Sequence, residues 1–298
     1  MLLPSDHVVA TGWPDYALRD SGDGRKLERF GPWSLVRPEP QAIWRPSLPA
    51  KAWDNAGGIF ATKASENEER AGQWTFAPQV PAEWMLAYRD IKLICRPTPF
   101  GHVGLFPEQA PHWDWMIERI GGVQGRKPRL LNLFGYTGAA SLLAAAAGAE
   151  VTHVDASRRA ITWARENQAA SGLDSAAIRW ICEDANKFVG RELRRTNRYS
   201  GILLDPPRYG RGPANEIWRI EQVGELLRNC AQLLDGKGAF IVLTVYAVRL
   251  SYLALYRLTQ QALADWPGTS EVGELLVREE KSERLLPTSF FVRWTRKA

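Results

Sequence analysis

The chain has 298 residues, of which 45% are hydrophobic and 24% charged, so we expect a folded protein with one large domain or a large and a small one. Its three cysteines (Cys95, Cys182 and Cys230) lie far apart and at no metal-ligand spacing, which excludes a disulfide scaffold and predicts no metal site. We find no apolar run of membrane-spanning length and no secretory signal, and therefore expect a cytoplasmic protein without membrane contact. The net charge of +5 favours an anionic partner.

The N-terminal part of the chain is rich in proline and tryptophan. Most of the 19 prolines and of the 13 tryptophans precede residue 126, and helical periodicity is scarce there. Short apolar segments at 33–37, 73–76 and 91–96, separated by Pro, Gly and Asp, predict strands and turns. Residues 65–72 are charged and predict an exposed loop or a helical turn. We expect a β-containing domain over residues 1–118 that recognises substrate or acts as a lid.

Strand and helix patterns alternate in the rest of the chain, which we expect to form a second domain over residues 119–298. Strands are predicted at 129–134, 150–155, 177–182, 199–205 and 238–244, and helices at 139–148, 158–171, 185–195, 215–234 and 248–264. Two last strands, 271–278 and 289–295, have no helix between them and should form an antiparallel hairpin at the sheet edge. The predicted fold is α/β, a doubly wound, mostly parallel, seven-stranded sheet with a smaller β-rich N-terminal domain.

Ligands of such a sheet bind outside the carboxyl ends of its strands. The first strand leads into Gly135 and Gly138, which permit a tight turn, and acidic residues end the next three strands. Asp155 can accept two hydrogen bonds from a ribose diol, and Asp184 can accept one from the amine of an adenine ring. Such a carboxylate can also merely cap the next helix. Acids at three successive strand ends, beside this turn, favour a nucleoside site.

The first turn also discriminates between nucleoside cofactors. A nicotinamide dinucleotide would require G-x-G-x-x-G there, whereas the chain has F-G-Y-T-G. Phe134 and Tyr136 would crowd a pyrophosphate, but aromatic faces attract sulfur and cations. S-adenosylmethionine fits this pattern because it combines a ribose, an adenine and a methylsulfonium without phosphate.

Four motifs together resemble a known family: N-L-F-G-Y-T-G at 132–138, D-A-S at 155–157, E-D-A at 183–185 and D-P-P-R-Y-G at 205–210. The series is similar to that of class I S-adenosylmethionine-dependent methyltransferases, which have a Rossmann-like fold, and more narrowly to the bacterial family that includes the 23S ribosomal RNA cytosine-C5 methyltransferases. The likeness covers roughly residues 100–295. The segment 104–109 (GLFPEQ) resembles the family's cofactor-covering segment. The resemblance implies cofactor binding by Phe106, Gln109, Phe134, Gly135, Tyr136, Thr137, Gly138, Asp155, Ala156, Ser157, Glu183, Asp184, Ala185 and Asp205.

Two departures from that family affect the expected chemistry. Residues 1–100 do not match its PUA-type RNA-binding module, and no cysteine lies in the segments directly after the fourth and fifth predicted strands, 205–208 and 243–247. Methylation at C5 of a pyrimidine needs a thiolate that adds at C6. We therefore expect direct methyl transfer without a cysteine nucleophile, in which positioning does most of the work. The expected catalytic residues are Asp205, Pro206 and Pro207, and the expected substrate-binding residues are Arg208, Tyr209 and Arg211.

The leading hypothesis is an S-adenosylmethionine-dependent methyltransferase that acts on RNA, with ribosomal RNA as the expected substrate. Two alternatives remain open: a methyltransferase of a protein or small molecule, and a non-catalytic module that binds RNA or protein. Arginines 191, 194, 195 and 198 are interpreted as a solvated helix face. His102, His112 and His153 are interpreted as structural or surface residues. The sequence does not indicate an oligomeric state.

Overall fold

The computed structural model describes the chain except residues 1–4, 11, 63–71, 124, 208, 214–215, 237, 247–250 and 298, and except the side chains of residues 5, 6, 209 and 211. The chain divides into two compact units. The larger comprises residues 1–8, 109–275 and 289–298, and the smaller comprises residues 9–108 and 276–288. The predicted boundary at 118/119 falls within helix α2 (Ala110–Gly121), all of which belongs to the larger unit.

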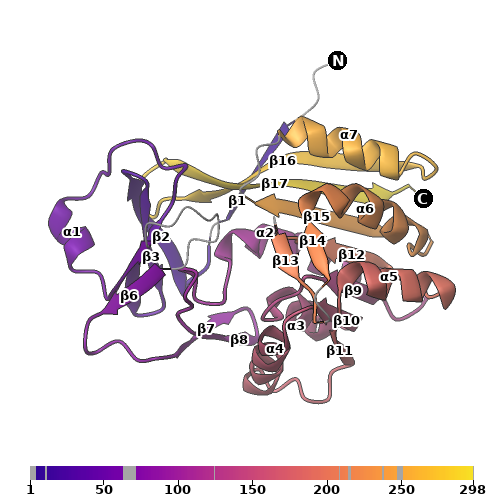
Figure 1. Cartoon of the computed structure of the whole chain (residues 1–298), viewed down its shortest axis with the longest axis horizontal. Helices are drawn as coiled ribbons and strands as arrows, with labels where there is room; N and C mark the ends of the chain where they lie inside the picture. Colours follow the sequence, from indigo (N-terminus) through magenta and orange to yellow (C-terminus); the bar gives the residue numbers. More distant parts are fainter. Residues whose placement is uncertain are drawn as a thin grey trace. The chain divides into compact units, whose positions relative to one another are not determined.

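The main sheet has eight strands in the order β1-β16-β17-β15-β12-β9-β10-β11 (Figure 1). Neighbours from β15 to β11 pair in parallel, and β17 pairs antiparallel with β15. The doubly wound fold is thereby confirmed. The strand β1 was not predicted, and it lies outside β16, where the terminal hairpin was expected to form the edge. The strands are β1 (Ser5–Ala10), β9 (Arg129–Leu133), β10 (Glu150–Asp155), β11 (Ile178–Cys182), β12 (Gly201–Leu204), β15 (Phe240–Tyr246), β16 (Gly268–Arg278) and β17 (Leu285–Arg296).

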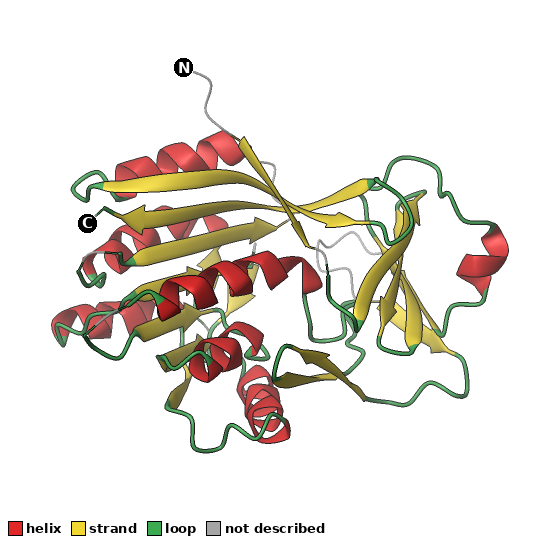
Figure 2. Cartoon of the chain, turned by 180° about the vertical axis from the view of Figure 1, so that it is seen from behind, coloured by secondary structure: helices red, strands yellow, loops and turns green. Residues whose placement is uncertain are grey.

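Helices cover both faces of this sheet. The helices α5, α6 and α7 lie on the face seen in Figure 1, and α2, α3 and α4 lie on the face seen in Figure 2. Buried Leu, Ile and Val side chains at alternate strand positions form one core cluster with buried side chains of the first group of helices, among them Phe188 of α5. No described helix has the length and apolar character needed to cross a membrane. The helices not yet given bounds are α3 (Ala139–Ala146), α4 (Arg158–Ala170), α5 (Ala185–Arg194), α6 (Val223–Gln232) and α7 (Tyr252–Ala262).

The helix predicted at 215–234 is wrong over its first part. A hairpin of β13 (Tyr209–Arg211) and β14 (Ile217–Arg219) comes first, followed by the 3₁₀ turn η2 (Ile220–Gln222), and α6 begins only at Val223. The reason is tertiary: Trp218 is buried and its Nε1 donates to the Pro207 carbonyl oxygen at 2.7 Å. Helix α2 and the preceding 3₁₀ turn η1 (Pro107–Gln109) lie where little helical periodicity was visible.

The smaller unit is rich in β-structure, as expected. It contains a five-stranded sheet in the order β2-β3-β4-β5-β6, a β7-β8 hairpin and the short helix α1 (Ala50–Asp54). The charged stretch predicted at 65–72 lies, apart from Gly72, outside the described residues. The strands are β2 (Tyr16–Gly22), β3 (Arg25–Phe30), β4 (Trp33–Pro38), β5 (Gly58–Thr62), β6 (Gly72–Phe76), β7 (Trp84–Tyr88) and β8 (Ile91–Cys95).

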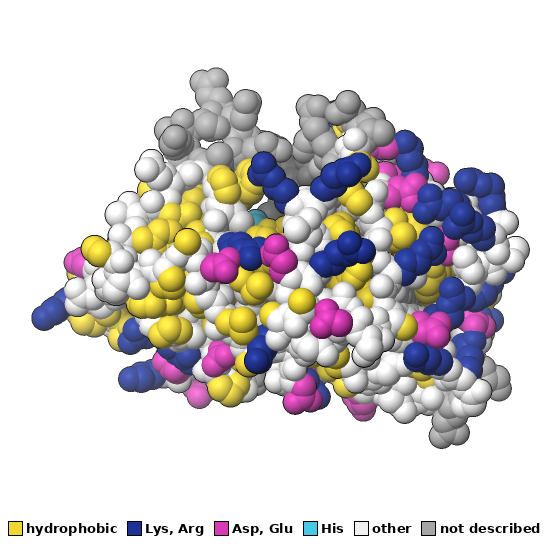
Figure 3. Space-filling view, turned by 90° about the horizontal axis from the view of Figure 1, so that it is seen from below, with side chains coloured by type: hydrophobic (Ala, Val, Ile, Leu, Met, Phe, Trp, Pro, Cys, Tyr) yellow, Lys and Arg dark blue, Asp and Glu magenta, His cyan; other side chains and the backbone are white. Residues whose placement is uncertain are grey.

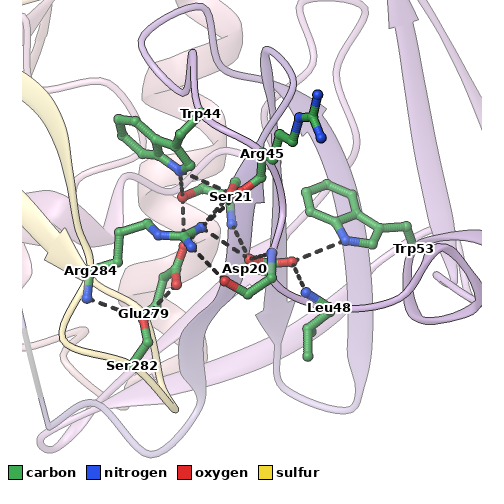
Figure 4. Close-up of polar contacts among 10 residues, drawn as sticks. Asp20, Ser21, Trp44, Arg45, Leu48, Trp53, Glu279, Ser282 and Arg284 are labelled. Carbon is green, nitrogen blue, oxygen red and sulfur yellow. Dashed lines mark hydrogen bonds and ion pairs between the residues drawn. The ribbon is translucent and has the colours of Figure 1, made fainter.

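A buried polar cluster attaches segment 276–288 to the rest of the smaller unit (Figure 4). The buried Asp20 carboxylate accepts from the backbone N–H of Leu48 at 2.7 Å. Buried Glu279 accepts from the Ser21 hydroxyl at 2.7 Å. The Arg284 guanidinium pairs with both acids, at 3.6 Å from Asp20 and 3.3 Å from Glu279. Buried carboxylates need such partners, so the late segment is an integral part of this unit.

Candidate functional site

The carboxyl ends of β9, β10 and β12 meet at one edge of the sheet. The chain runs from β9 outward to β10 and β11, then returns to β12 on the other side of β9, so the strand order reverses between β9 and β12. This reversal is the topological switch point at which doubly wound sheets bind ligands. Three predicted segments follow these strands: residues 134–138, 155–157 and 205–207.

The loop after β9 has an uncommon backbone. Phe134 and Tyr136 have φ angles of 58° and 50°, and Gly138 has a φ of 86°. Left-handed backbone costs a non-glycine residue on the order of 1–2 kcal/mol and clusters at functional sites. Hydrogen bonds hold the loop: Gly135 N–H donates to the Val154 carbonyl at 3.1 Å, and Tyr136 N–H donates to the Asp155 carboxylate at 2.9 Å. Surrounding structure thus maintains the strained loop at this edge.

A buried polar group lies behind the loop. The Ser141 hydroxyl accepts from the Asn132 amide at 2.9 Å and contacts His153 Nδ1 at 2.9 Å. Burial lowers the pKa of His153 to about 3, so the ring is neutral, in agreement with a structural role. A Cβ on Gly135 would lie 2.4 Å from His153 Cε1. Gly135 is therefore required by packing beneath the loop.

Asp155 is held at both carboxylate oxygens. Oδ2 accepts from Tyr136 N–H at 2.9 Å and Oδ1 accepts from Ser157 N–H at 2.8 Å. Burial raises its pKa, and the two hydrogen bonds oppose that rise. The Ser157 hydroxyl caps α4 by accepting from Ala160 N–H at 3.3 Å, so Asp155 is not the cap of that helix. Each carboxylate oxygen has capacity beyond one bond, which leaves Asp155 able to accept from a diol.

The two acids after β11 already have partners within α5. Asp184 Oδ1 accepts from Lys187 N–H at 3.0 Å and caps the helix, so the capping alternative applies to this residue. Arg191 Nη1 donates to Glu183 Oε1 at 2.8 Å, which makes Arg191 part of an ion pair. Neither contact tests whether Asp184 and Glu183 also bind a cofactor, and their assignment together with Ala185 stays a prediction.

A three-residue contact joins the end of β12 to the end of β15. Gln109 Nε2 donates to Asp205 Oδ2 at 3.1 Å and to Tyr246 Oη at 2.6 Å. Gln109 and Asp205 were predicted as site residues from two different motifs, and the structure brings them into contact. Tyr246 was not predicted as a site residue. Its position at the carboxyl end of a parallel strand, the same property that singled out the strand-end acids, could have identified it.

Trp218 contacts two of the predicted segments, and the remaining predicted residues are Phe106, Arg208, Tyr209 and Arg211. Trp218 is buried, and its ring lies 4.9 Å from that of Phe134, so it supports the 134–138 loop and the Pro206–Pro207 turn. Arg208 lies outside the described residues; Tyr209 and Arg211 lie in β13, but their side chains are not described. Phe106 belongs to the smaller unit, where its ring is 5.4 Å from that of His102.

The described thiols lack the features of nucleophiles. Burial raises the pKa of Cys182, that of Cys230 within α6, and that of Cys95, the last to about 12. A raised pKa keeps a thiol protonated at neutral pH and disfavours attack. Within the described ranges, no cluster of three or more His, Cys, Asp or Glu side chains could hold a metal ion.

This arrangement fits an adenosyl group without phosphates. Asp155 offers acceptors at the β10 end, and residues 134–138 contain no Lys or Arg that would neutralise a pyrophosphate. Gln109, Asp205 and Tyr246 provide a second polar group, across the switch point. The geometry therefore supports a ribose at one side of the edge and polar chemistry at the other.

Comparisons with known proteins agree with this description. Residues 95–248 match a family model described as S-adenosylmethionine-dependent methyltransferase. The crystal structure of a SAM-dependent methyltransferase from Agrobacterium tumefaciens is 44% identical, with a TM-score of 0.92, and the match covers 99% of this chain and 96% of that one.

Curated relatives are more distant and longer. The ribosomal RNA large subunit methyltransferase K/L of Shewanella frigidimarina is 29% identical over 60% of this chain and 25% of its own length. The ribosomal RNA large subunit methyltransferase I of Aeromonas salmonicida is 29% identical over 50% of this chain and 37% of its own length. This chain thus spans only a minor part of either relative.

Proposed function

Since the chain belongs to the S-adenosylmethionine-dependent methyltransferases, we propose that its methyl acceptor is RNA and that it transfers the methyl group directly. Bound S-adenosylmethionine supplies an electrophilic methyl group on a sulfonium that leaves readily. The Asp155 carboxylate would hold the ribose diol, and Asp184 with Ala185 would contact the adenine. The loop 134–138, with Ala156, Ser157 and Glu183, would complete the walls, and Phe106 and Gln109 would cover the donor.

The contact between Gln109 and Asp205 carries the proposal of direct transfer to an amino nitrogen. It places a carboxylate, restrained by an amide, at the end of β12 immediately before Pro206 and Pro207. The Asp205 carboxylate and the Pro206 carbonyl would accept N–H bonds from an amino group and aim its lone pair at the methyl carbon. The raised pKa values of the described thiols support a route without a cysteine nucleophile.

RNA is favoured as substrate by charge and by the relatives. Figure 3 shows Lys and Arg side chains gathered on the side of the molecule where Figure 1 draws α5. The exposed arginines include Arg179 on β11, Arg194 at the end of α5 and Arg198 four residues after it. The last two were interpreted from the sequence as part of a solvated helix face, and we propose that this face contacts RNA. Such side chains bind phosphates without reading sequence. Two curated relatives are named as ribosomal RNA large subunit methyltransferases. We infer that the chain is related to these RNA methyltransferases, including the cytosine-C5 methyltransferases. We also infer that it methylates an amino nitrogen and not the C5 carbon of a pyrimidine.

The test compares modified nucleosides in ribosomal RNA from cells with and without the protein, by mass spectrometry. We expect one methylated nucleoside to disappear on deletion and to return with the wild-type gene but not with the D205A variant. The methylated atom would be the nitrogen of an exocyclic amino group. Unchanged RNA in the deletion strain would refute the RNA proposal and favour a protein or small-molecule acceptor. A lost C5-methylated pyrimidine would refute the amino-directed route.

A further inference from the structure

Tyr246 lies where the fifth parallel strand of the sheet ends. It is the last residue of β15, which pairs in parallel with β12, the strand that leads to Asp205. Its hydroxyl accepts from Gln109 Nε2 at 2.6 Å, a shorter bond than the 3.1 Å contact from the same nitrogen to Asp205. Three segments that are distant in sequence therefore meet through one amide nitrogen.

The two acceptors fix which way the Gln109 amide faces. An ionised carboxylate only accepts, so the amide must present its NH₂ group, and not its carbonyl oxygen, to Asp205. The NH₂ group has two hydrogens, and the Tyr246 hydroxyl accepts the second one. Gln109 is 8% exposed, so water has little access to replace a lost partner. With both acceptors present, neither hydrogen of the amide is left unpaired and the carboxylate has a restrained donor.

We propose that Tyr246 is a positioning residue: its hydroxyl orients the Gln109 amide for binding of S-adenosylmethionine and, through that amide, the Asp205 carboxylate for the amino group of the acceptor. The inference rests on the proposed function of Gln109 and Asp205. Removing the hydroxyl leaves one amide hydrogen unpaired and releases the amide to rotate about its last torsion. The Asp205 carboxylate then has a less restrained donor. Ordering the Gln109 amide when the ligand binds costs entropy, which weakens the affinity.

The test is a double-mutant cycle on the full-length protein, with the affinity for S-adenosylmethionine measured by calorimetry. Tyr246→Phe removes only the hydroxyl, and Gln109→Ala removes the amide. We expect Y246F to weaken binding about tenfold, as the loss of one short buried hydrogen bond implies. In the Q109A background the same change should have almost no effect, because its mediator is absent.

A matched control is available on α7, where Gln260 Nε2 donates to Tyr256 Oη at 2.8 Å on an exposed face. Y256F removes the same kind of bond and should leave the affinity unchanged. The side-chain amide resonances of Gln109 in a ¹⁵N spectrum should shift in Y246F and stay in place in Y256F.

Wild-type affinity in Y246F would overturn the inference while leaving the proposed function intact. An undiminished tenfold loss from Y246F in the Q109A background would also overturn it, since the effect would then bypass the amide. If the wild-type protein itself does not bind S-adenosylmethionine, the proposed function of the site fails and this inference fails with it.

Discussion

Replacing Gly135 by alanine tests whether packing behind the 134–138 loop determines its conformation. The added methyl would lie 2.4 Å from Cε1 and 2.6 Å from Nδ1 of His153, and 3.0 Å from the Asn132 amide nitrogen. Carbon contacts are normally about 3.5–4.0 Å, so a shift of roughly 1 Å is required. His153 cannot yield easily, because it is fully buried, is bonded to Ser141 and has its ring 4.6 Å from that of Trp180.

Overpacking of this kind costs about 1–3 kcal/mol of folding free energy. For a unit of this size we expect G135A to lower the unfolding midpoint by roughly 2–12 °C. Because His153 cannot move easily, the loop itself should be displaced. That displacement disturbs the hydrogen bond from Tyr136 N–H to Asp155, so the affinity for S-adenosylmethionine should fall as well. Differential scanning calorimetry and isothermal titration give the two quantities.

The control is Gly121→Ala near the end of α2, where an added Cβ meets nothing within 4 Å. This variant should match or slightly exceed the wild type in stability and bind the cofactor normally. Adding His153→Ala to G135A should recover part of the lost affinity by vacating the space. If G135A and G121A behaved alike in both assays, the packing argument would be refuted.

Three further outcomes are expected. Asp155→Ala should weaken S-adenosylmethionine binding by about 1–3 kcal/mol, or roughly 5- to 150-fold, in calorimetry; unchanged affinity would refute the ribose assignment. The folded pKa of His153, about 3, lies below its ordinary 6.5, so its stabilising contribution is present above pH 6.5 and is lost as the pH falls toward 3; a His153→Gln variant should lose less stability between pH 7 and 5 in denaturant titrations, and parallel losses would contradict this. The pair R194E and R198E should weaken ribosomal RNA binding and flatten its salt dependence at unchanged cofactor affinity; an unaltered salt slope would exclude this face from the interface.

The predictable part of the fold has local causes. Buried parallel strands appear in the sequence as short segments rich in apolar and β-branched residues. Strand β10 has the predicted bounds because Val151, Thr152 and Val154 lie between two acidic residues, Glu150 and Asp155. The Ser157 cap of α4 likewise needs only a serine at the position before the helix.

Long-range contacts account for what was not predicted. The β13–β14 hairpin depends on Trp218 reaching the Pro207 carbonyl, so a helix-like apolar pattern was misread as an early start of α6. Tyr246 carries no motif of its own, and its link to Gln109 follows only from the sheet order. The acids at the strand ends look alike in sequence, but the partners of Asp155 and Asp184 separate a loop-holding carboxylate from a helix cap.

Residues 276–288 give the β-rich unit an unusual dependence on the order of synthesis. Asp20 and Ser21 are synthesised early. Their buried partners Glu279 and Arg284 are synthesised only after residues 109–275 of the larger unit. The smaller unit therefore cannot complete these contacts until nearly the whole chain has been made. Fragments that stop at residue 108 would expose this gap, and a stable isolated version would need the late segment grafted back onto it.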